Sequence, residues 1–212
     1  MKKKLATILL LLLVSLSGYS QMSWKVKAGV NISDITNWEL ADYKPGYQFG
    51  VGMDYYFNNH WGIQPSLMLI SKGYKIKGDN FNSFYSAQYI NQELMFYDIT
   101  DNKVYVELPL LLTYRFNVSG KYKLIFSGGG YVGYGIAGKT KNTATLLNGS
   151  TRKDKVDSFS AGVEKFDTGL AAGATLEYKE KYSIGISSDF GLQSTQSTFK
   201  NRTYGLTFGY RF

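Results

Sequence analysis

The residues best suited to chemistry in this sequence are ionisable side chains spread through most of its length. The basic ones are Lys25, Lys27, Lys72, Arg115, Lys123 and Arg211. The acidic ones are Asp54, Glu107, Asp167, Glu177 and Asp189. Such groups can transfer protons, guide ions or form salt bridges, and the fold decides which, because each role depends on the distance between partners.

Nucleophilic and metal-centred chemistry has few candidates. The chain has no Cys, which excludes thiolate ligands, disulfides, a cysteine nucleophile and an acylated lipoprotein terminus, and one His removes every His-cluster metal site. His60 lies between Asn59 and Trp61, and we expect it to serve turn geometry and interface polarity. The carboxylates of Asp167 and Glu177 are well separated along one strand. We predict no catalytic, cofactor-binding or metal-binding residues, no cofactor and no enzyme activity.

These ionisable residues lie in segments with strict period-two alternation. In the last segment, YGLTFGYRF, large apolar or aromatic residues alternate with Gly, Thr and Arg. Alternation of this kind is typical of a β-strand with two different faces. Eight strands are predicted: Trp24–Ser33, Tyr47–Asn58, Trp61 to about Ile76, Val104–Phe116, Tyr122–Ala137, Phe166–Tyr178, Tyr182–Leu192 and Tyr204–Phe212.

The connections between these strands alternate strictly between short and long. The short ones are Asn59–His60, Asn117–Lys121 and Lys179–Lys181; the long ones are Asp34–Gly46, about Lys77–Lys103, Gly138–Lys165 and Gln193–Asn201. A soluble β-sandwich also has alternating strands, but it gives no reason to sort loop lengths by end. An even strand number with short periplasmic turns and longer outer loops is typical of a transmembrane barrel. We predict an all-β, eight-stranded antiparallel up-and-down transmembrane β-barrel.

Aromatic residues support the barrel over the sandwich. They gather on the apolar face at the short-turn end of all eight strands, the level at which amphipathic rings prefer to lie in a membrane. The members of this belt are Trp24, Tyr55, Phe57, Trp61, Tyr114, Phe116, Tyr122, Tyr178, Tyr182, Tyr210 and Phe212.

The other face of each strand must then line a narrow lumen. Eight strands enclose only enough space for side chains, so enclosed charges must pair or lose several kcal/mol each to desolvation. Inward glycines leave room for the long ionisable side chains. We expect a salt-bridged plug; a proton or ion path is the alternative, and the sequence does not show which partners meet.

The N-terminus has the pattern of a secretory signal peptide. Three lysines precede an apolar run of 12 residues, and Gly18 and Ser20 precede a predicted cut before Gln21. A membrane-spanning helix would need roughly 20 apolar residues. We predict a cleaved signal peptide over residues 1–20 and a mature barrel over 21–212. Without Lys2, Lys3 and Lys4 the mature chain keeps 21 basic and 16 acidic residues, a net charge of +5 that gives no reason to expect nucleic-acid binding.

The outer loops are the remaining place for function. Thr151–Asp157 reads TRKDKVD, either a solvated loop tip or a site for phosphates of lipopolysaccharide or for a partner protein. Phe81–Ile90 has four aromatics in ten residues, which predicts packing over the barrel mouth or a docking surface. The following NQELMFYDIT is a candidate hairpin that would extend the barrel above the membrane.

The ordered segments WKVKAGVNIS, GYQFGVGMDYYFNNHWGIQPSLMLISKGYKI, VYVELPLLLTYRF, FDTGLAAGATLEYKEKYSIGISSDFGL and TYGLTFGYRF resemble the outer-membrane β-barrel family of Bacteroidetes that includes PorT-like proteins. The resemblance covers Gln21 to Phe212, and ELPLLLTYRF (Glu107–Phe116) is its most specific part. It implies an eight-stranded barrel in a Gram-negative outer membrane and supplies no catalytic motif. PorT itself is linked to type IX secretion and gliding. The terminal Phe212, with Tyr210 before it, also resembles the signal that such barrels present to their insertion machinery.

We therefore expect a monomeric outer-membrane barrel with a plugged lumen and long extracellular loops, acting as a structural or binding module. The expected partners are outer-membrane lipids, lipopolysaccharide, the barrel-assembly machinery during insertion and an envelope protein at the outer loops. An accessory subunit of a secretion or uptake machine, in the PorT-like sense, is the main alternative. A narrow pore or a lipid-modifying enzyme is a third.

Overall fold

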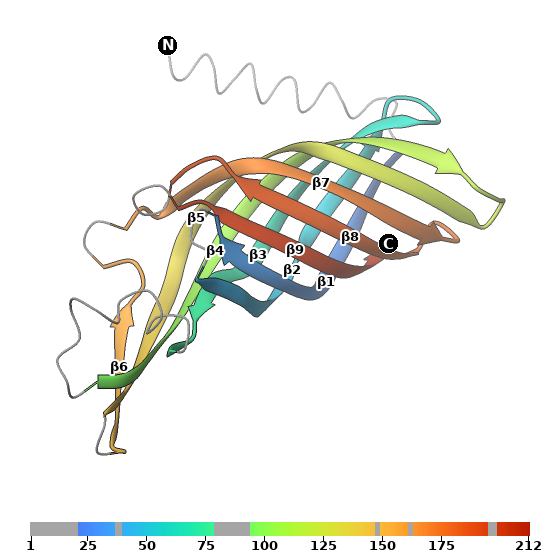
Figure 1. The fold of residues 1–212 in the computed structure, drawn as a ribbon. Helices are drawn as coiled ribbons and strands as arrows, with labels where there is room; N and C mark the ends of the chain where they lie inside the picture. The colour runs from blue at the N-terminus through green and yellow to red at the C-terminus, as the bar shows by residue number, and fades with distance from the viewer. Residues whose placement is uncertain (1–20, 37–39, 79–93, 147–148, 161–162, 195–198) are drawn as a thin grey trace, which may run out of the picture.

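The structure is a computed structural model that describes residues 21–36, 40–78, 94–146, 149–160, 163–194 and 199–212. Nine strands form one antiparallel sheet (Figure 1). They are β1 (Gln21–Ile35), β2 (Ala41–Tyr56), β3 (Trp61–Ile76), β4 (Leu94–Asn117), β5 (Tyr122–Leu146), β6 (Thr151–Asp157), β7 (Phe166–Tyr178), β8 (Tyr182–Gly191) and β9 (Asn201–Arg211). Within these ranges no helix has the length and hydropathy needed to cross a membrane.

Eight of these strands close into a ring. The order is β1, β2, β3, β4, β5, β7, β8 and β9, and β9 pairs with β1 to complete the circle. In that final seam Tyr204 lies opposite Ile32, and Phe208 lies opposite Ala28. The predicted fold class and strand count are therefore confirmed. Closure leaves no free strand edge inside a membrane, where an unpaired backbone group costs several kcal/mol.

The distribution of apolar and charged side chains in the barrel is the reverse of that in a soluble protein. Outward positions such as Phe208, which is 59% exposed, carry large apolar side chains, whereas Lys72, Glu107 and Asp167 are fully buried in the interior. This arrangement follows from period two, because every second side chain of a strand points to the same face. Lipid contacts the apolar exterior, and the charged residues face one another inside.

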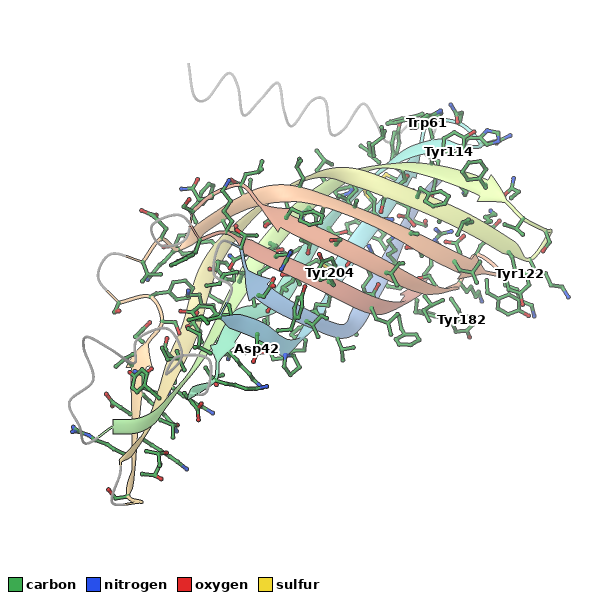
Figure 2. The ribbon with its side chains drawn as sticks, viewed as in Figure 1. Asp42, Trp61, Tyr114, Tyr122, Tyr182 and Tyr204 are labelled. Atoms are coloured by element: carbon green, nitrogen blue, oxygen red, sulfur yellow. The ribbon has the colours of Figure 1, made fainter. Side chains whose placement is uncertain are left out.

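Rings at the short-turn end touch in pairs between neighbouring strands. The ring centroids of Trp61 and Tyr114 are 4.8 Å apart, and those of Tyr182 and Tyr210 are 5.6 Å apart. Figure 2 shows Trp61, Tyr114, Tyr122 and Tyr182 at the end of the barrel that carries the short turns. The belt predicted from the sequence therefore lies at one level, as a membrane interface requires.

The strands are longer at the opposite end than the sequence predicts. β4 begins at Leu94 instead of Val104, β5 continues to Leu146 instead of Ala137, and β2 begins at Ala41 instead of Tyr47. Beyond the ring, β4 and β5 continue as a sheet to which β6 is added, and this sheet projects from the barrel in Figure 1. The chain expected as the hairpin NQELMFYDIT therefore pairs with β5 from Leu94 onward.

β6 was expected to be a loop, and that expectation was wrong. Thr151–Asp157 pairs with Lys139–Thr145 of β5, and all seven of its residues are exposed. A strand with solvent on both faces has no apolar alternation, so its sequence carries no period-two signal. The predicted signal peptide (residues 1–20) and the aromatic segment Phe81–Ile90 lie outside the described residues.

Candidate functional site in the barrel lumen

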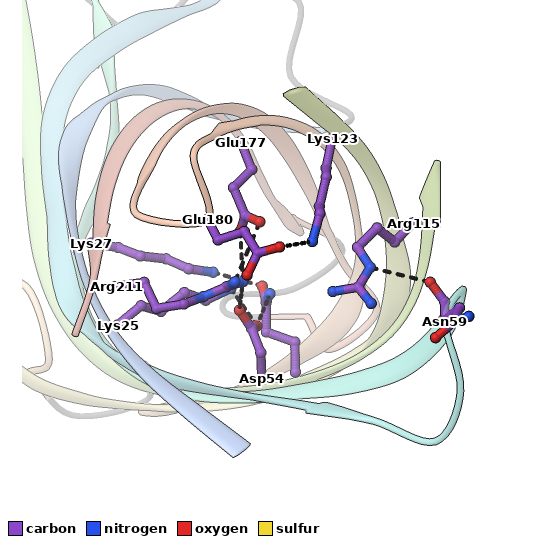
Figure 3. Close-up of polar contacts among 10 residues, drawn as sticks. Lys25, Lys27, Asp54, Asn59, Arg115, Lys123, Glu177, Glu180 and Arg211 are labelled. Atoms are coloured by element: carbon purple, nitrogen blue, oxygen red, sulfur yellow. Dashed lines mark hydrogen bonds and ion pairs between the residues drawn. The ribbon is translucent and has the colours of Figure 1, made fainter. Parts of the chain in front are cut away.

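The periplasmic half of the lumen holds a group of charges centred on Asp54, which we call the periplasmic cluster (Figure 3). Lys25 on β1 donates to Asp54 Oδ1 on β2 at 2.5 Å, and Gln64 on β3 donates to the same oxygen at 2.6 Å. Arg211 on β9 donates to Asp54 Oδ2 at 2.6 Å. One carboxylate, 1% exposed, thus receives three donors from three other strands.

Arg211 forms ion pairs with strands on opposite sides of the lumen. Its guanidinium also lies 2.6 Å from Glu177 Oε2 on β7, so β2, β7 and β9 are bridged across the lumen. Lys27 extends the cluster by donating to Gln64 Oε1 at 2.7 Å. Because a guanidinium forms a planar fork of donors, one side chain can hold two carboxylates in defined positions.

A second group of charges, the outer cluster, fills the other half of the lumen. Lys72 on β3 lies 2.5 Å from Glu107 on β4 and 3.2 Å from Asp167 on β7. Asp167 also accepts hydrogen bonds from Tyr131 at 3.4 Å and from Asn201 at 2.9 Å. The Lys72 ammonium lies 4.4 Å from the centroid of the Tyr131 ring, a cation–π distance.

A glycine makes room for the outer cluster. Gly133 of β5 is paired with Glu107 on one side and with Asp167 on the other. A Cβ at Gly133 would lie 3.0 Å from Glu107 Cγ, closer than ordinary contact. The absence of a side chain there lets two carboxylates approach the same ammonium, as the inward glycines in the sequence predicted.

Little space separates the two clusters. A cavity of about 80 Å³ lies between them, lined in part by Lys27, Gln64, Glu107 and Asp189. Room on this scale holds a few water molecules. Asp189 is buried and close enough to Lys72 and Asp167 to interact with them electrostatically.

A phenylalanine from beyond β6 covers the outer mouth of the lumen. The Phe159 ring lies over Gly135, so that a Cβ there would be 2.1 Å from it, and its centroid is 5.7 Å from that of Tyr105. Lys103 Nζ lies 6.0 Å from the same ring. Tyr105 is completely buried beneath this cap. Packing over the mouth or a docking surface was expected of Phe81–Ile90, which lies outside the described residues; within them, Phe159 lies over the mouth.

An ion pair closes the seam between β1 and β9 at its outer end. Arg202 donates from Nε to Asp34 Oδ1 at 2.9 Å and from Nη2 to Asp34 Oδ2 at 2.5 Å. This pair was not predicted, because both residues lie at the margin of predicted strands, where inward and outward positions are hard to assign.

The ionisable residues predicted to face the lumen all point inward, but only some of them form ion pairs with one another. Lys25, Lys72 and Arg211 meet predicted carboxylates. Lys123 instead pairs with Glu180 of the turn after β7, and this contact lowers the pKa of Glu180. Arg115 pairs with no carboxylate of the described chain. Uncharged Gln64, Tyr131 and Asn201 complete the two clusters. Gln64 and Tyr131 had only their inward parity in predicted strands as a signal, whereas Asn201 was expected in the loop before the last strand and lies in β9.

The structure keeps possible catalytic groups apart. Glu177 lies in the periplasmic cluster and Asp167 in the outer cluster. His60 is exposed in the turn after β2, its ring 5.6 Å from that of Tyr114, while the side chain of Asn58 accepts the backbone N–H groups of His60 and Trp61 at 2.8 Å. Across the described ranges no three His, Cys, Asp or Glu side chains are grouped as a metal site requires.

A closed ring of eight antiparallel strands with an apolar exterior, an aromatic belt and a charged interior defines an integral β-barrel membrane protein. The sequence model of the family described as the outer membrane protein beta-barrel domain matches residues 17–197, most of the chain. The protein therefore belongs to that family, and it is an outer-membrane protein of a Gram-negative envelope. The predicted localisation is confirmed.

Solved structures show similar barrels at low identity. Ail, the attachment invasion locus protein of Yersinia pestis, in complex with the heparin analogue sucrose octasulfate, is 19% identical with a TM-score of 0.43; the match covers 90% of this chain and 99% of Ail. OprG from Pseudomonas aeruginosa is 15% identical with a TM-score of 0.40, covering 92% and 98%. The outer membrane enzyme PagL is 11% identical with a TM-score of 0.44, covering 88% and 98%. No curated protein sequence matches significantly.

Proposed function

We propose that this protein is a non-conducting, non-catalytic outer-membrane barrel whose outer sheet binds phosphate groups of lipopolysaccharide. The plugged lumen acts as a rigid support, and the β4–β5–β6 extension is the binding module. Insertion by the barrel-assembly machinery and a monomeric state belong to the same proposal. The observation that carries it is a face of lysines on this extension, next to the lipid-facing wall.

The lysine face is formed by side chains that share one side of the extension. Residues directly opposite in antiparallel strands point to the same side, and so do residues two apart in one strand. By this rule Lys141 lies opposite Lys155, and Lys139 lies opposite Asp157. The exposed charged members of the face are Lys139, Lys141, Lys153, Lys155, Asp98 and Asp157, with lysines in excess.

The position of the lysine face favours a lipid partner. Val104 of β4 pairs with Ala137 of β5, and Lys139 lies two residues further along the same side of β5. The face therefore continues the outer wall of the barrel from the level of lipid chains towards the level of head groups. Phosphates of lipopolysaccharide in the outer leaflet would lie at this level.

The Lys141–Lys155 pair brings two like charges together in the free protein. Like charges directly opposite in a sheet destabilise it by roughly 0.2–1 kcal/mol. A phosphate between the two ammonium groups would reverse the sign of that interaction. Charge-assisted hydrogen bonds to phosphate are about twice as strong as neutral ones.

Thermal unfolding in bilayers with and without lipopolysaccharide tests this proposal. We expect lipopolysaccharide to raise the melting temperature of the wild type, because it binds the folded state only. The double variant Lys141→Gln/Lys155→Gln should lose most of that increase. The matched control is Lys179→Gln/Lys181→Gln, in the turn at the other end of the barrel. An equal increase for both double variants would contradict the proposal, as would hydrolysis of lipid A by the purified protein.

The accessory-subunit alternative has one supporting observation. β6 is the last strand of the sheet, so its outer edge is available to another strand in the part of the chain that the structure describes. Exposed edges are ready templates for strand addition by a partner. Co-purification of a stoichiometric envelope protein from native membranes, lost when residues 151–157 are deleted, would favour a PorT-like role over lipid binding.

A further inference from the structure

A polar pocket lies at the periplasmic mouth of the barrel, and the side chains of the lumenal ion pairs do not fill it. Its volume is about 460 Å³, and it lies among the short-turn ends of the strands. The polar side chains around it include Tyr56, Asn59, Arg115, Lys123, Glu180 and Arg211. Most of them appear in Figure 3, viewed with the front of the barrel cut away.

Arg115 is the unusual member of this pocket. Its Nε donates to the backbone oxygen of Asn59 at 3.2 Å, and its guanidinium carbon lies 3.9 Å from the centroid of the Tyr56 ring. No carboxylate of the described residues pairs with it, and in Figure 3 its dashed line leads only to Asn59. Only 7% of Arg115 is exposed, so a charge with four remaining N–H donors is almost enclosed without a counter-ion.

Two more polar atoms at the pocket lack partners within the described chain. The hydroxyl of Tyr56, a residue only 7% exposed, and Nε of Arg211 are both buried without a hydrogen bond. Buried polar atoms in native proteins nearly always have a partner, so each exception needs an explanation. Both atoms can donate, and both belong to residues that line the same pocket.

Among the described residues, one positive charge at the pocket has no acidic partner. Lys123 is neutralised by Glu180, and Arg211 is held by Asp54 and Glu177. Arg115 is therefore the cation at the pocket that has no acidic partner among the described residues. The free donors therefore belong to residues that line one pocket, where a negative group would gain hydrogen bonds and neutralise the enclosed charge.

We propose that this pocket binds a phosphate group from the periplasmic side, held by the guanidinium of Arg115 with Tyr56 and Arg211 as further donors. Phosphate suits the site because each of its non-bridging oxygens accepts strong charge-assisted hydrogen bonds, and the donors come from three side chains. The pocket is large enough for a phosphate together with the organic group that carries it. That group can be the head group of an inner-leaflet phospholipid or a soluble phosphate compound.

Titration of the folded barrel in phosphate-free dodecyl maltoside tests the proposal. The probes are inorganic phosphate and, separately, the short-chain lipid dihexanoyl phosphatidylglycerol. NMR of the ¹⁵N-labelled arginine Nε groups should show saturable shifts for Arg115 and Arg211 with at least one probe. Arg115→Gln should weaken binding roughly tenfold or more, as expected for the loss of charged hydrogen bonds. Arg152→Gln, on exposed β6, is the matched control and should bind as the wild type does.

A second variant keeps the test valid if Arg115→Gln fails to fold. Tyr56→Phe removes a single hydroxyl that has no partner in the described residues, and it should weaken binding roughly threefold. Folding of each variant is checked by the change in gel migration on boiling. Tighter binding of the lipid assigns the site to a head group, and equal binding assigns it to a soluble phosphate.

The proposal is overturned if neither probe gives saturable shifts. It is also overturned if both pocket variants bind with the affinity of Arg152→Gln. It does not depend on the lysine face, which lies at the other end of the barrel and is tested by different variants.

Discussion

At the scale of single residues, this protein is organised around charges that lipid-exposed strands hold inside a narrow tube. Asp54 has three donors from β1, β3 and β9, and Lys72 has two carboxylates from β4 and β7. Burying a charge is favourable only when its partners compensate the lost hydration. Each cluster therefore stabilises the barrel only while it is complete.

Asp54→Asn is the sharpest test of this dependence. The substitution keeps the shape but leaves Lys25 without its carboxylate and Arg211 with only Glu177. We expect a loss of about 3–5 kcal/mol in the free energy of unfolding, the cost of breaking a buried pair. Urea unfolding in lipid vesicles, followed by tryptophan fluorescence, measures it. Asp154→Asn, on exposed β6, should change stability by less than about 0.5 kcal/mol, and similar losses for both variants would contradict the argument.

Glu180 should make stability depend on pH at the periplasmic turn. Its pKa in the folded state is lowered by Lys123, so the pair stabilises the fold above the ordinary Glu pKa of about 4.3, and that stability is lost as pH falls through the lower folded value. The melting temperature of the wild type should therefore be higher than that of Glu180→Gln at neutral pH, and the two melting temperatures should become equal in acid. Melting curves from pH 7 down to strong acid measure the difference. If the two melting temperatures instead became equal as the pH rises, the Lys123–Glu180 pair would not be the cause of the pH dependence. The same conclusion would follow if the exposed Glu164→Gln variant showed a similar pH dependence.

At the scale of elements, the outer mouth depends on a contact between a strand and the segment after β6. Phe159 can lie over the lumen only because Gly135 of β5 has no side chain. The contact links the extension to the ring, since β6 ends at Asp157 and the cap follows it by two residues. We therefore expect a displacement of the extension to move Phe159 away from the outer mouth.

Gly135→Ala should release this cap without unfolding the barrel. The added methyl group would lie 2.1 Å from the Phe159 ring, so the ring must move away. Chymotrypsin, which cleaves after accessible aromatic residues, should then cut at Phe159 faster in proteoliposomes. Gly128→Ala is the matched control on the same strand, because its methyl group would meet nothing within 4 Å. Equal cleavage of the two variants would show that Phe159 does not depend on Gly135.

At the scale of the whole molecule, the two clusters and the cap place obstacles at three levels of the lumen. An eight-stranded barrel has room for little more than its own side chains. We expect no steady conductance from the wild type in planar bilayers at neutral pH, with a general porin measured in parallel as the positive control. A stable ohmic channel would contradict the plug and favour the ion-path alternative from the sequence.

Period-two alternation was enough to predict the ring of eight strands, its lipid-facing side, its aromatic belt and the inward direction of the ionisable residues. Each of these follows from local sequence, because parity along a strand decides which face a side chain occupies. An extension of the barrel above the membrane was expected at NQELMFYDIT, but as a hairpin of its own, whereas its described part pairs with β5. The full length of β5 and the existence of β6 could not be predicted, since strands in water on both faces need no apolar alternation.

Only the tertiary structure decided which charges meet. Lys72 reaches Asp167 although they are 95 residues apart, and Arg211 reaches Asp54 across 157 residues. Such pairings depend on the stagger of strands around the closed barrel, which sets the height of each inward residue. The same stagger leaves Arg115 beside Tyr56 and without a carboxylate from the described residues. Parity is a property of one strand and can be taken from its sequence, whereas height in the lumen is a property of the whole ring.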